Sequence, residues 1–328
     1  MDKDSLSVNL QKVFDAYDEE DVPLIVILGP TAVGKTELSL KLAKLLQGEI
    51  VSGDSRLIYR GMDIGTAKPS QEEMALVPHH LIDVTDLDKP WSLSDFQHAV
   101  DEAILQIHRR GNLPILVGGT GQYIRALSEG WKIPAVKPNP SLRKILENFG
   151  REIGPEALHS RLSTIDPLAA ALIEPRNLRR TVRAFEVIFS TGYPFSAQRQ
   201  CQPSRYRLLK IGLHRPRAEL YQRIDARLDA MIAAGFVDEV KNFLCQGYSP
   251  DLPGFSAIGY RELADHLQGK ISLEEAIVLI KRRTRVYVRH QANWFKMDDP
   301  TIHWFLVEEG YEKKAEDTIM QWLSADNE

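Results

Sequence analysis

The sequence predicts an α/β fold: a P-loop-containing core with a parallel, doubly wound sheet, plus a helical insertion domain. Three observations predict it. An apolar run at residues 24–28 leads into the octet GPTAVGKT at residues 29–36, strand and helix patterns alternate through the N-terminal third, and helical patterns follow Pro134. Strands that alternate with helices favour a parallel sheet covered on both faces.

The N-terminal third supplies the expected elements in order. The polar stretch RGMDIGTAKPS lacks periodicity and is predicted to be a loop. The predicted strands are residues 24–28, 49–52 and 113–117, and the predicted helices are residues 37–46 and 92–111. The three strand ends carry GPTAVGKT, Gly53-Asp54-Ser55 and Gly118-Gly119-Thr120-Gly121. Because ligands of such sheets bind beyond the carboxyl ends of the strands, we expect these loops to converge on one crevice.

Composition changes at residues 131–134, and the proline-rich segment that follows predicts an insertion. Patterns are then helical to about Ile188, and residues 206–213 are predicted to rejoin the sheet before a helix that Pro216 opens and Gly235 closes. The predicted division is an N-terminal tail (1–21), a P-loop core (22–133 plus 176–310), a helical insertion (134–175) and a C-terminal helix or tail (311–328).

The composition is that of an ordinary globular chain. Of its 328 residues, 43% are apolar and 26% are charged, and the formal net charge is −4. The two cysteines, Cys201 and Cys245, supply neither a disulfide framework nor a set of four zinc ligands. No apolar segment resembles a signal peptide or is long enough to span a bilayer. We expect a cytoplasmic monomer with no membrane partner.

Two arginine-rich runs stand out in this net-acidic chain. One is EPRNLRRTVR at residues 174–183, and the other is KRRTRVYVRH at residues 281–290. Either run alone could be a solvated helix surface. Two dense runs together favour an anionic partner that touches the protein through several phosphates.

The octet GPTAVGKT matches G-x-x-x-x-G-K-[ST] at every fixed position, between a predicted strand and a predicted helix. Such a loop surrounds phosphate oxygens with backbone N–H groups at a helix N-terminus. Lys35 adds a charge to the phosphate, and the Thr36 hydroxyl is placed to ligate Mg²⁺. The sequence therefore predicts a phosphate-binding loop of the nucleotide-binding, ATP-binding type.

The acid that usually completes a nucleotide-hydrolysing site is missing from its expected place. The strand at residues 113–117 ends in glycines, and His80-Leu81-Ile82-Asp83 has only two apolar residues before its acid. We therefore expect the loop to hold a diphosphate that leaves rather than a triphosphate that is cut.

Seven segments, in this order, resemble the bacterial tRNA dimethylallyltransferases. They are GPTAVGKT, DSRLIYRGMDIGTAKP, PHHLID, GGTGQYI, RTVRAFEV, AIGYRE and TRVYVRHQANWFK. The resemblance covers about residues 22–310. It implies Mg²⁺-dependent transfer of a dimethylallyl group from dimethylallyl diphosphate to N6 of adenosine 37 in a tRNA anticodon stem-loop. It also implies that the helical insertion clasps this stem-loop.

The resemblance implies roles residue by residue. Asp54 would be the general base, and Lys35, Thr31 and Arg227 would complete the catalytic set. The diphosphate would be bound by Gly29, Pro30, Thr31, Ala32, Val33, Gly34, Lys35, Thr36, Arg223 and Arg227, with Thr36 as the Mg²⁺ ligand. The tRNA-binding residues would be Asp54, Ser55, Arg56, Leu57, Thr120, Arg143, Arg179, Arg180, Arg183, Ser256, Ala257, Ile258, Gly259, Tyr260 and Arg261.

The chain departs from the family pattern at Leu57, Ser256, Val286 and His290, where Gln, Gln, Gln and Arg are common. We expect these changes to affect tRNA recognition more than transfer. Three alternative functions are a P-loop kinase for a small metabolite, a prenyltransferase acting on free adenine nucleotides, and a non-catalytic RNA-binding protein. GMDIGTAKP and the missing strand-end acid oppose the first, the insertion and basic runs oppose the second, and the combination of Lys35, Thr36 and Asp54 opposes the third.

Overall fold

A computed structural model describes residues 21–133, 139–198 and 202–325. The predicted N-terminal tail therefore lies almost wholly outside the described residues. The chain forms two compact units: Glu129–Ser204 make the smaller one, and the residues on either side make the larger one. Within the described ranges no helix is long and apolar enough to cross a bilayer.

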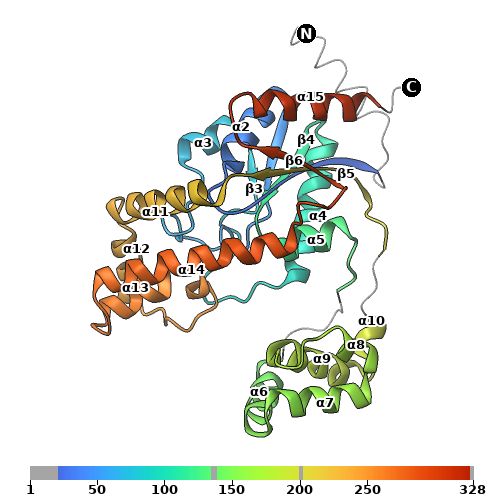
Figure 1. Cartoon of the computed structure of the whole chain (residues 1–328), viewed down its shortest axis with the longest axis vertical. Coiled ribbons are helices and arrows are strands. Elements are labelled where there is room, and N and C mark those ends of the chain that lie inside the picture. The colour runs from blue at the N-terminus through green and yellow to red at the C-terminus, as the bar shows by residue number, and fades with distance from the viewer. Residues whose placement is uncertain (1–20, 134–138, 199–201, 326–328) are drawn as a thin grey trace. The chain divides into compact units, whose positions relative to one another are not determined.

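The larger unit contains a sheet of six parallel strands in the order β3-β2-β4-β1-β5-β6 (Figure 1). The strands are β1 (Val22–Leu28), β2 (Gly48–Ser52), β3 (His79–His80), β4 (Leu113–Gly118), β5 (Tyr206–His214) and β6 (Ile302–Leu306). Every residue of β1 is buried, which fits its apolar run and its place between β4 and β5. The predicted parallel sheet is confirmed. The sequence did not predict β3 or β6, the two short strands at its edges.

Helices cover both faces of the sheet. On one face, α2 (Lys35–Leu45) and α15 (Tyr311–Ser324) share an apolar cluster with the first turns of α11 (Arg217–Ala233). On the other face, α4 (Leu93–Arg109) and α5 (Gly121–Ser128) form a second cluster. The doubly wound arrangement is therefore confirmed. The predicted C-terminal helix is α15, and it belongs to the core because Ala315, Ile319 and Leu323 are buried there.

A group of helices beyond the sheet has its own apolar core. Its members are the end of α11, α12 (Phe236–Cys245), the short 3₁₀ turn η1 (Gly254–Ser256), α13 (Tyr260–Leu267) and α14 (Leu273–Trp294). Figure 1 shows α11 to α14 extending together to one side of the sheet. The predicted loop at residues 60–70 lies against this group through Met62. It contains no strand or helix, as predicted, and α3 (Gln71–Leu76) follows it.

The smaller unit is helical, as predicted, but the predicted boundaries 134–175 are wrong. Its helices are α6 (Pro140–Ile153), α7 (Pro155–Ile165), α8 (Pro167–Ala171), α9 (Leu178–Thr191) and α10 (Phe195–Gln198). Val182 and Phe185 of α9 share a core with Leu146 of α6 and Leu158 of α7. The apolar face of α9 is buried inside this unit, so residues 176–204 belong to it and not to the P-loop core.

Candidate active site

Three loops meet at the carboxyl ends of neighbouring strands β2, β4 and β1. The Gly53 amide donates to the Val117 carbonyl at 2.8 Å, and the Ser55 amide donates to Thr120 Oγ1 at 3.1 Å. Gly118 permits this contact, because a Cβ there would lie 2.4 Å from the carbonyl oxygen of Gly53. The predicted convergence of GPTAVGKT, the Asp54 loop and the GGTG loop is confirmed.

The phosphate loop adopts left-handed backbone conformations that its sequence permits. Gly29 and Gly34 have φ of 145° and 116°, and Ala32 has φ of 65°. Lys35 Nζ donates to the carbonyls of Gly29 and Pro30 at 3.0 and 2.8 Å, so its ammonium lies inside the loop. A left-handed loop leading into a helix N-terminus is the geometry that binds phosphate through backbone N–H groups.

Two arginines brace the outer side of this loop. Arg223 Nε donates to the Ala32 carbonyl at 2.9 Å, and Arg215 Nε donates to the Val33 carbonyl at 3.0 Å. The Val33 side chain is buried in the core, so of this residue only the backbone can face a ligand. Arg223 is thus next to the predicted diphosphate site, and Arg215 is a brace that the sequence did not reveal.

Lys35, Arg227 and Asp54 form the electrostatic centre of the crevice. Burial lowers the pKa of Lys35 to about 8, the Arg227 charge acts in the same direction, and Asp54 opposes both. Burial also lowers the pKa of Arg227, again with Asp54 acting against the shift. Among the described residues neither Lys35 nor Arg227 makes an ion pair. Two half-buried cations without a paired carboxylate form a site for an anion.

The Asp54 carboxylate keeps most of its hydrogen-bonding capacity. Its Oδ1 accepts the Arg56 amide at 2.8 Å, and no second donor to this carboxylate lies in the described part of the chain. The bond to Arg56 closes a short turn of the kind common for strand-end acids. The other oxygen is left to meet a substrate.

Two side chains of α14 reach the crevice, and the sequence reasoning did not select them. Gln291 is 3% exposed; its Oε1 accepts the Thr31 amide and its Nε2 donates to the Gly119 carbonyl, both at 2.9 Å. Tyr287 hydrogen-bonds to Thr120 and Gln291, and burial together with Asp54 raises its pKa to about 12. Both residues lie in TRVYVRHQANWFK, which was the one available signal. Because the Thr31 amide donates to Gln291, Thr31 can donate a hydrogen bond to a ligand only through its hydroxyl group.

Comparison with known proteins identifies the family. Residues 57–298 match the model of a protein family described as "IPP transferase". A tRNA dimethylallyltransferase of Roseiflexus sp. is 49% identical over 93% of this chain and 100% of that protein. The chain belongs to the IPP transferase family. A second tRNA dimethylallyltransferase, from Roseiflexus castenholzii, is 53% identical over 84% of this chain and 90% of its own length.

Solved structures of the IPP transferase family agree with the fold. The tRNA isopentenylpyrophosphate transferase of Bacillus halodurans is 43% identical, covers 93% of this chain and 98% of its own, and has a TM-score of 0.70. A eukaryotic dimethylallyltransferase acting on tRNA is 28% identical over 93% of this chain and 80% of its own, with a TM-score of 0.77. The described α/β architecture is therefore that of this family.

The predicted tRNA-binding residues of the larger unit differ in how far they are buried. Arg56, which is half-buried, donates to Ser256 Oγ at 2.9 Å, and Ser256 and Arg261 are exposed. In contrast, Tyr260 is 0% exposed and Ala257 is 5% exposed. Both side chains pack inside the α12–α14 core, so a contact of Tyr260 or Ala257 with RNA would have to use the backbone. Gly259 is buried as well, whereas Leu57 and Ile258 are half-buried.

The four predicted arginines of the smaller unit differ in their surroundings. Arg143 Nε and Arg183 Nη1 both donate to the fully buried Glu186 carboxylate, at 2.9 and 2.6 Å. Burial alone would raise the pKa of Glu186, but the bonds from these arginines lower it below its ordinary range. Arg179 and Arg180 are exposed on α9, with no hydrogen bond from either guanidinium within the described residues. These two arginines retain their full charge for an anionic partner.

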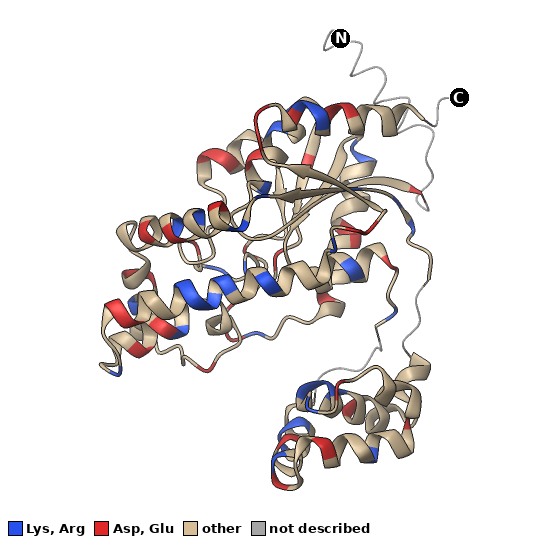
Figure 2. Ribbon diagram, in the orientation of Figure 1, with Lys and Arg blue, Asp and Glu red and all other residues tan. Residues whose placement is uncertain are grey.

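The basic run of α14 is largely neutralised by neighbouring acids. Figure 2 shows lysines and arginines along its length. Arg285 donates to Asp225 at 2.6 Å and Lys281 pairs with Asp229 at 2.9 Å, while Arg283 pairs with Glu262. Arg282 and Arg289 are exposed and, among the described residues, unpaired; with Lys281, Arg285 and Val278 they line a surface depression.

Thr36 lies in the first turn of α2 with an exposed side chain. No group of three or more histidine, cysteine or acidic residues suited to a metal occurs in the described part of the chain. The Thr36 hydroxyl at the end of the phosphate loop would suit Mg²⁺, an ion that takes oxygen ligands and usually keeps several waters.

Proposed function

We propose that this crevice transfers the dimethylallyl group of dimethylallyl diphosphate to N6 of adenosine 37 in tRNA and releases diphosphate. The observation that carries the proposal is the group formed by Lys35, Arg227 and Asp54 at the ends of neighbouring strands. Two cations without carboxylate partners can stabilise a departing diphosphate. A carboxylate with one oxygen that accepts no hydrogen bond can take a proton from the attacking amino group.

The leaving group accounts for the cations. When C1 of the dimethylallyl group bonds to N6, the C1–O bond breaks and its electron pair stays on the diphosphate oxygen. Lys35 and Arg227, with the loop amides and the Thr31 hydroxyl, stabilise this added charge more strongly than they stabilise the intact donor. Arg223 extends the same positive surface from α11. Mg²⁺ held through Thr36 would neutralise further negative charge on the diphosphate.

The nucleophile accounts for Asp54. The N6 lone pair of adenine is delocalised into the ring, so attack is easier if a carboxylate removes the N6 proton as the new bond forms. Asp54 accepts that proton, which contributes roughly 10²–10⁴-fold to the rate. Thr120 Oγ1 accepts the Ser55 amide and donates to Ser55 Oγ, and these two residues orient the purine beside Asp54.

RNA binding would use mainly arginines for which no ion pair is found among the described residues, together with the hydroxyl of Ser256. Arg179 and Arg180 of the smaller unit, with Arg56, Ser256 and Arg261 of the larger one, would contact the anticodon stem-loop. Arg143 and Arg183 are also proposed to contact the RNA backbone, with both guanidiniums held in place by Glu186. We further propose that the protein acts as a monomer in the cytoplasm.

One labelling experiment tests the proposal. The protein is incubated with Mg²⁺ and radiolabelled dimethylallyl diphosphate, together with either bulk tRNA or AMP. We expect label in tRNA at adenosine 37 and none in AMP. Labelled AMP would transfer the proposal to free nucleotides, and steady ATP turnover without prenyl donor would replace it with a kinase.

A further inference from the structure

The segment GMDIGTAKP at residues 61–69 has no part in the chemistry described above. It folds into a tight turn in which the Ala67 amide donates to the Ile64 carbonyl at 2.9 Å and the Lys68 amide donates to the Asp63 carbonyl at 3.0 Å. Ala67 is left-handed, with φ of 50°. Side chains from other parts of the larger unit hold this turn in place from two sides.

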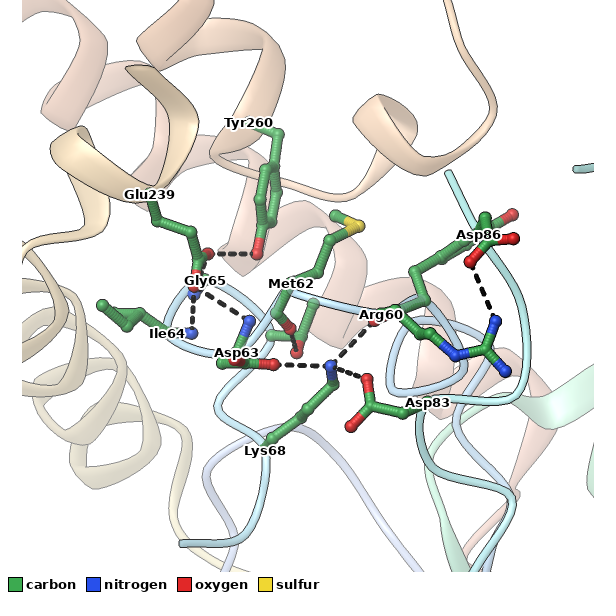
Figure 3. A network of polar contacts seen from close by, with 12 residues as sticks. Arg60, Met62, Asp63, Ile64, Gly65, Lys68, Asp83, Asp86, Glu239 and Tyr260 are labelled. Carbon is green, nitrogen blue, oxygen red and sulfur yellow. Dashed lines mark hydrogen bonds and ion pairs between the residues drawn. The ribbon is translucent and has the colours of Figure 1, made fainter. Parts of the chain in front are cut away.

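Glu239 of α12 fixes one side of the turn. Its carboxylate accepts three consecutive amides, those of Asp63, Ile64 and Gly65, at 2.9, 2.7 and 3.1 Å (Figure 3). It also accepts the hydroxyl of the buried Tyr260 at 2.6 Å. A carboxylate that accepts several backbone amides is a strong, directional anchor, because charge-assisted hydrogen bonds exceed neutral ones in strength.

Packing reinforces this anchor. A Cβ at Gly65 would lie 2.1 Å from a ring carbon of Phe236, and a Cβ at Gly259 would lie 2.6 Å from the same ring. Phe236 therefore fits between two glycines, one from GMDIGTAKP and one from AIGYRE. Two of the segments that carry the family resemblance are thus packed against each other.

Lys68 fixes the other side of the turn. Its side chain is 4% exposed, and its ammonium donates to the Tyr59 carbonyl at 2.8 Å and to the carboxylates of Asp63 and Asp83 (Figure 3). Both acids are more exposed, at 62% and 42%. Burying a lysine between half-solvated acids recovers little of the cost of its desolvation, so stability is a weak explanation for this arrangement.

The segment that Lys68 holds begins three residues after Asp54. The carbonyls of Leu57, Ile58 and Tyr59 are each occupied, by the Asp83 amide at 3.1 Å, the Thr85 amide at 3.0 Å and Lys68 Nζ at 2.8 Å, respectively. The side chain of Asp83 is in turn bonded to Lys68. Three consecutive fixed carbonyls set the direction in which the chain leaves the Asp54 turn.

From this chain of contacts we infer that Lys68 and Glu239 are positioning residues for the transfer step. They aim the segment Asp54–Leu57 at the adenine, through residues 57–59 and 63–65. Neither touches a reacting atom. The inference rests on the proposed role of Asp54 as the base. It also gives a role to the buried Lys68 ammonium, which its half-solvated partners Asp63 and Asp83 do not explain by stability.

A double-mutant cycle tests this inference. The variants are Lys68→Met, Asp54→Asn and the two combined, with Lys89→Met as control because Lys89 is an exposed loop lysine paired with Asp86. Single-turnover transfer to tRNA with saturating donor gives the rate, equilibrium binding gives the donor affinity, and thermal unfolding gives the stability. We expect Lys68→Met to lower the rate by about 10- to 100-fold, as misplacement near 1 Å can. Donor affinity should stay within about twofold.

The decisive result is the non-additivity of the two substitutions. If Lys68 acts through Asp54, then Lys68→Met should cause little further loss in the Asp54→Asn protein. Equal losses in both backgrounds, or a lower unfolding temperature with an unchanged rate, would overturn the inference and leave Lys68 as a structural residue. A wild-type protein that labels no tRNA would instead refute the proposed function. If Lys68→Met does not fold, Glu239→Gln takes its place in the cycle, with the same outcomes.

Discussion

A carboxylate lies at each end of strand β2, and the two differ in the number of hydrogen bonds that they accept. At its start, Glu49 is 3% exposed and accepts two bonds from Arg110, at 3.1 and 2.7 Å, one from Asn112 at 2.7 Å, and a contact with His80 Nε2 at 2.6 Å. Just past its end, Asp54 is half-buried and its carboxylate accepts the Arg56 amide alone among the described donors. One acid is saturated with partners and the other is held by a single bond.

The cations next to these acids differ in the same way. Arg110 is committed to Glu49, whereas Lys35 and Arg227 face Asp54 without forming an ion pair within the described chain. Burial alone would raise the pKa of Glu49, but its hydrogen bonds lower it to about 2. A charge cluster in which every group has a partner stabilises the fold. Charges that lack partners are unfavourable until a ligand pairs with them, so they favour ligand binding. The comparison assigns stability to one end of β2 and chemistry to the other.

The largest expected effect lies at the chemical end. Asp54→Asn should cut single-turnover transfer by roughly 10²- to 10⁴-fold, because the amide cannot accept the N6 proton. Fold, unfolding temperature and tRNA affinity should be preserved, since Asn can still accept the Arg56 amide. Measuring the rate with saturating donor isolates the chemical step. Near-normal transfer would reduce Asp54 to a turn acid and erase the contrast with Glu49.

The matching change at the structural end should do the opposite. Glu49→Gln should lower the free energy of unfolding by about 1–2 kcal/mol, because the donors around this buried side chain lose a charged acceptor, while Arg110, 45% exposed, is still solvated by water. The transfer rate per folded molecule should be unchanged. Chemical denaturation at neutral pH measures the loss. A fall in rate with unaltered stability would contradict the assignment of this end to stability.

The lowered pKa of Glu49 determines the pH range in which this residue stabilises the fold. Its pKa is about 2 when folded against an ordinary value of 4.5, so the stabilisation is complete above about pH 4.5. It should be lost as the pH falls toward 2. The difference in unfolding free energy between wild type and Glu49→Gln should therefore shrink over that interval and stay constant above it.

A smaller effect should appear in the pH dependence of donor binding. Lys35 has a pKa of about 8 in the free protein, so it loses its charge as the pH rises above that value. Diphosphate binds the charged form, and its affinity should fall by up to about tenfold per pH unit above pH 8. Isothermal titration with dimethylallyl diphosphate measures this. Lys35→Met should bind more weakly at neutral pH and show no such decline; an identical decline in the variant would assign the titration to another group.

The sequence could predict the chemical end of β2 better than the structural end. GPTAVGKT and Gly53-Asp54-Ser55 are local patterns, and their position after apolar runs placed them at strand ends that had to converge. Glu49 gave no comparable signal, because its partners Arg110 and Asn112 come from the far end of α4 and the chain beyond it. Its third partner, His80, lies in β3, a strand too short to show periodicity.

Long-range contacts explain the remaining omissions. Gln291 lies 260 residues from the Thr31 amide that it accepts, and Glu239 lies 174 residues from the Gly65 amide. No spacing rule connects positions so far apart in sequence. The boundary of the smaller unit failed for the same reason, because α9 looks like any amphipathic helix until its packing against α6 and α7 is known.

The smallest expected effect concerns the free arginines of the smaller unit, which carry the comparison of paired and unpaired charges beyond β2. Replacing both Arg179 and Arg180 with Ala should weaken tRNA binding and lower the slope of log affinity against log salt by about 1–2, because each exposed guanidinium releases about one counterion. Donor affinity should not change. The control is Arg176→Ala, whose guanidinium already pairs with Glu156 at 2.9 Å on an equally exposed surface. Filter binding across a salt series separates the two: if the control reduced the slope as much as the double variant, internal pairing would not determine which arginines meet RNA.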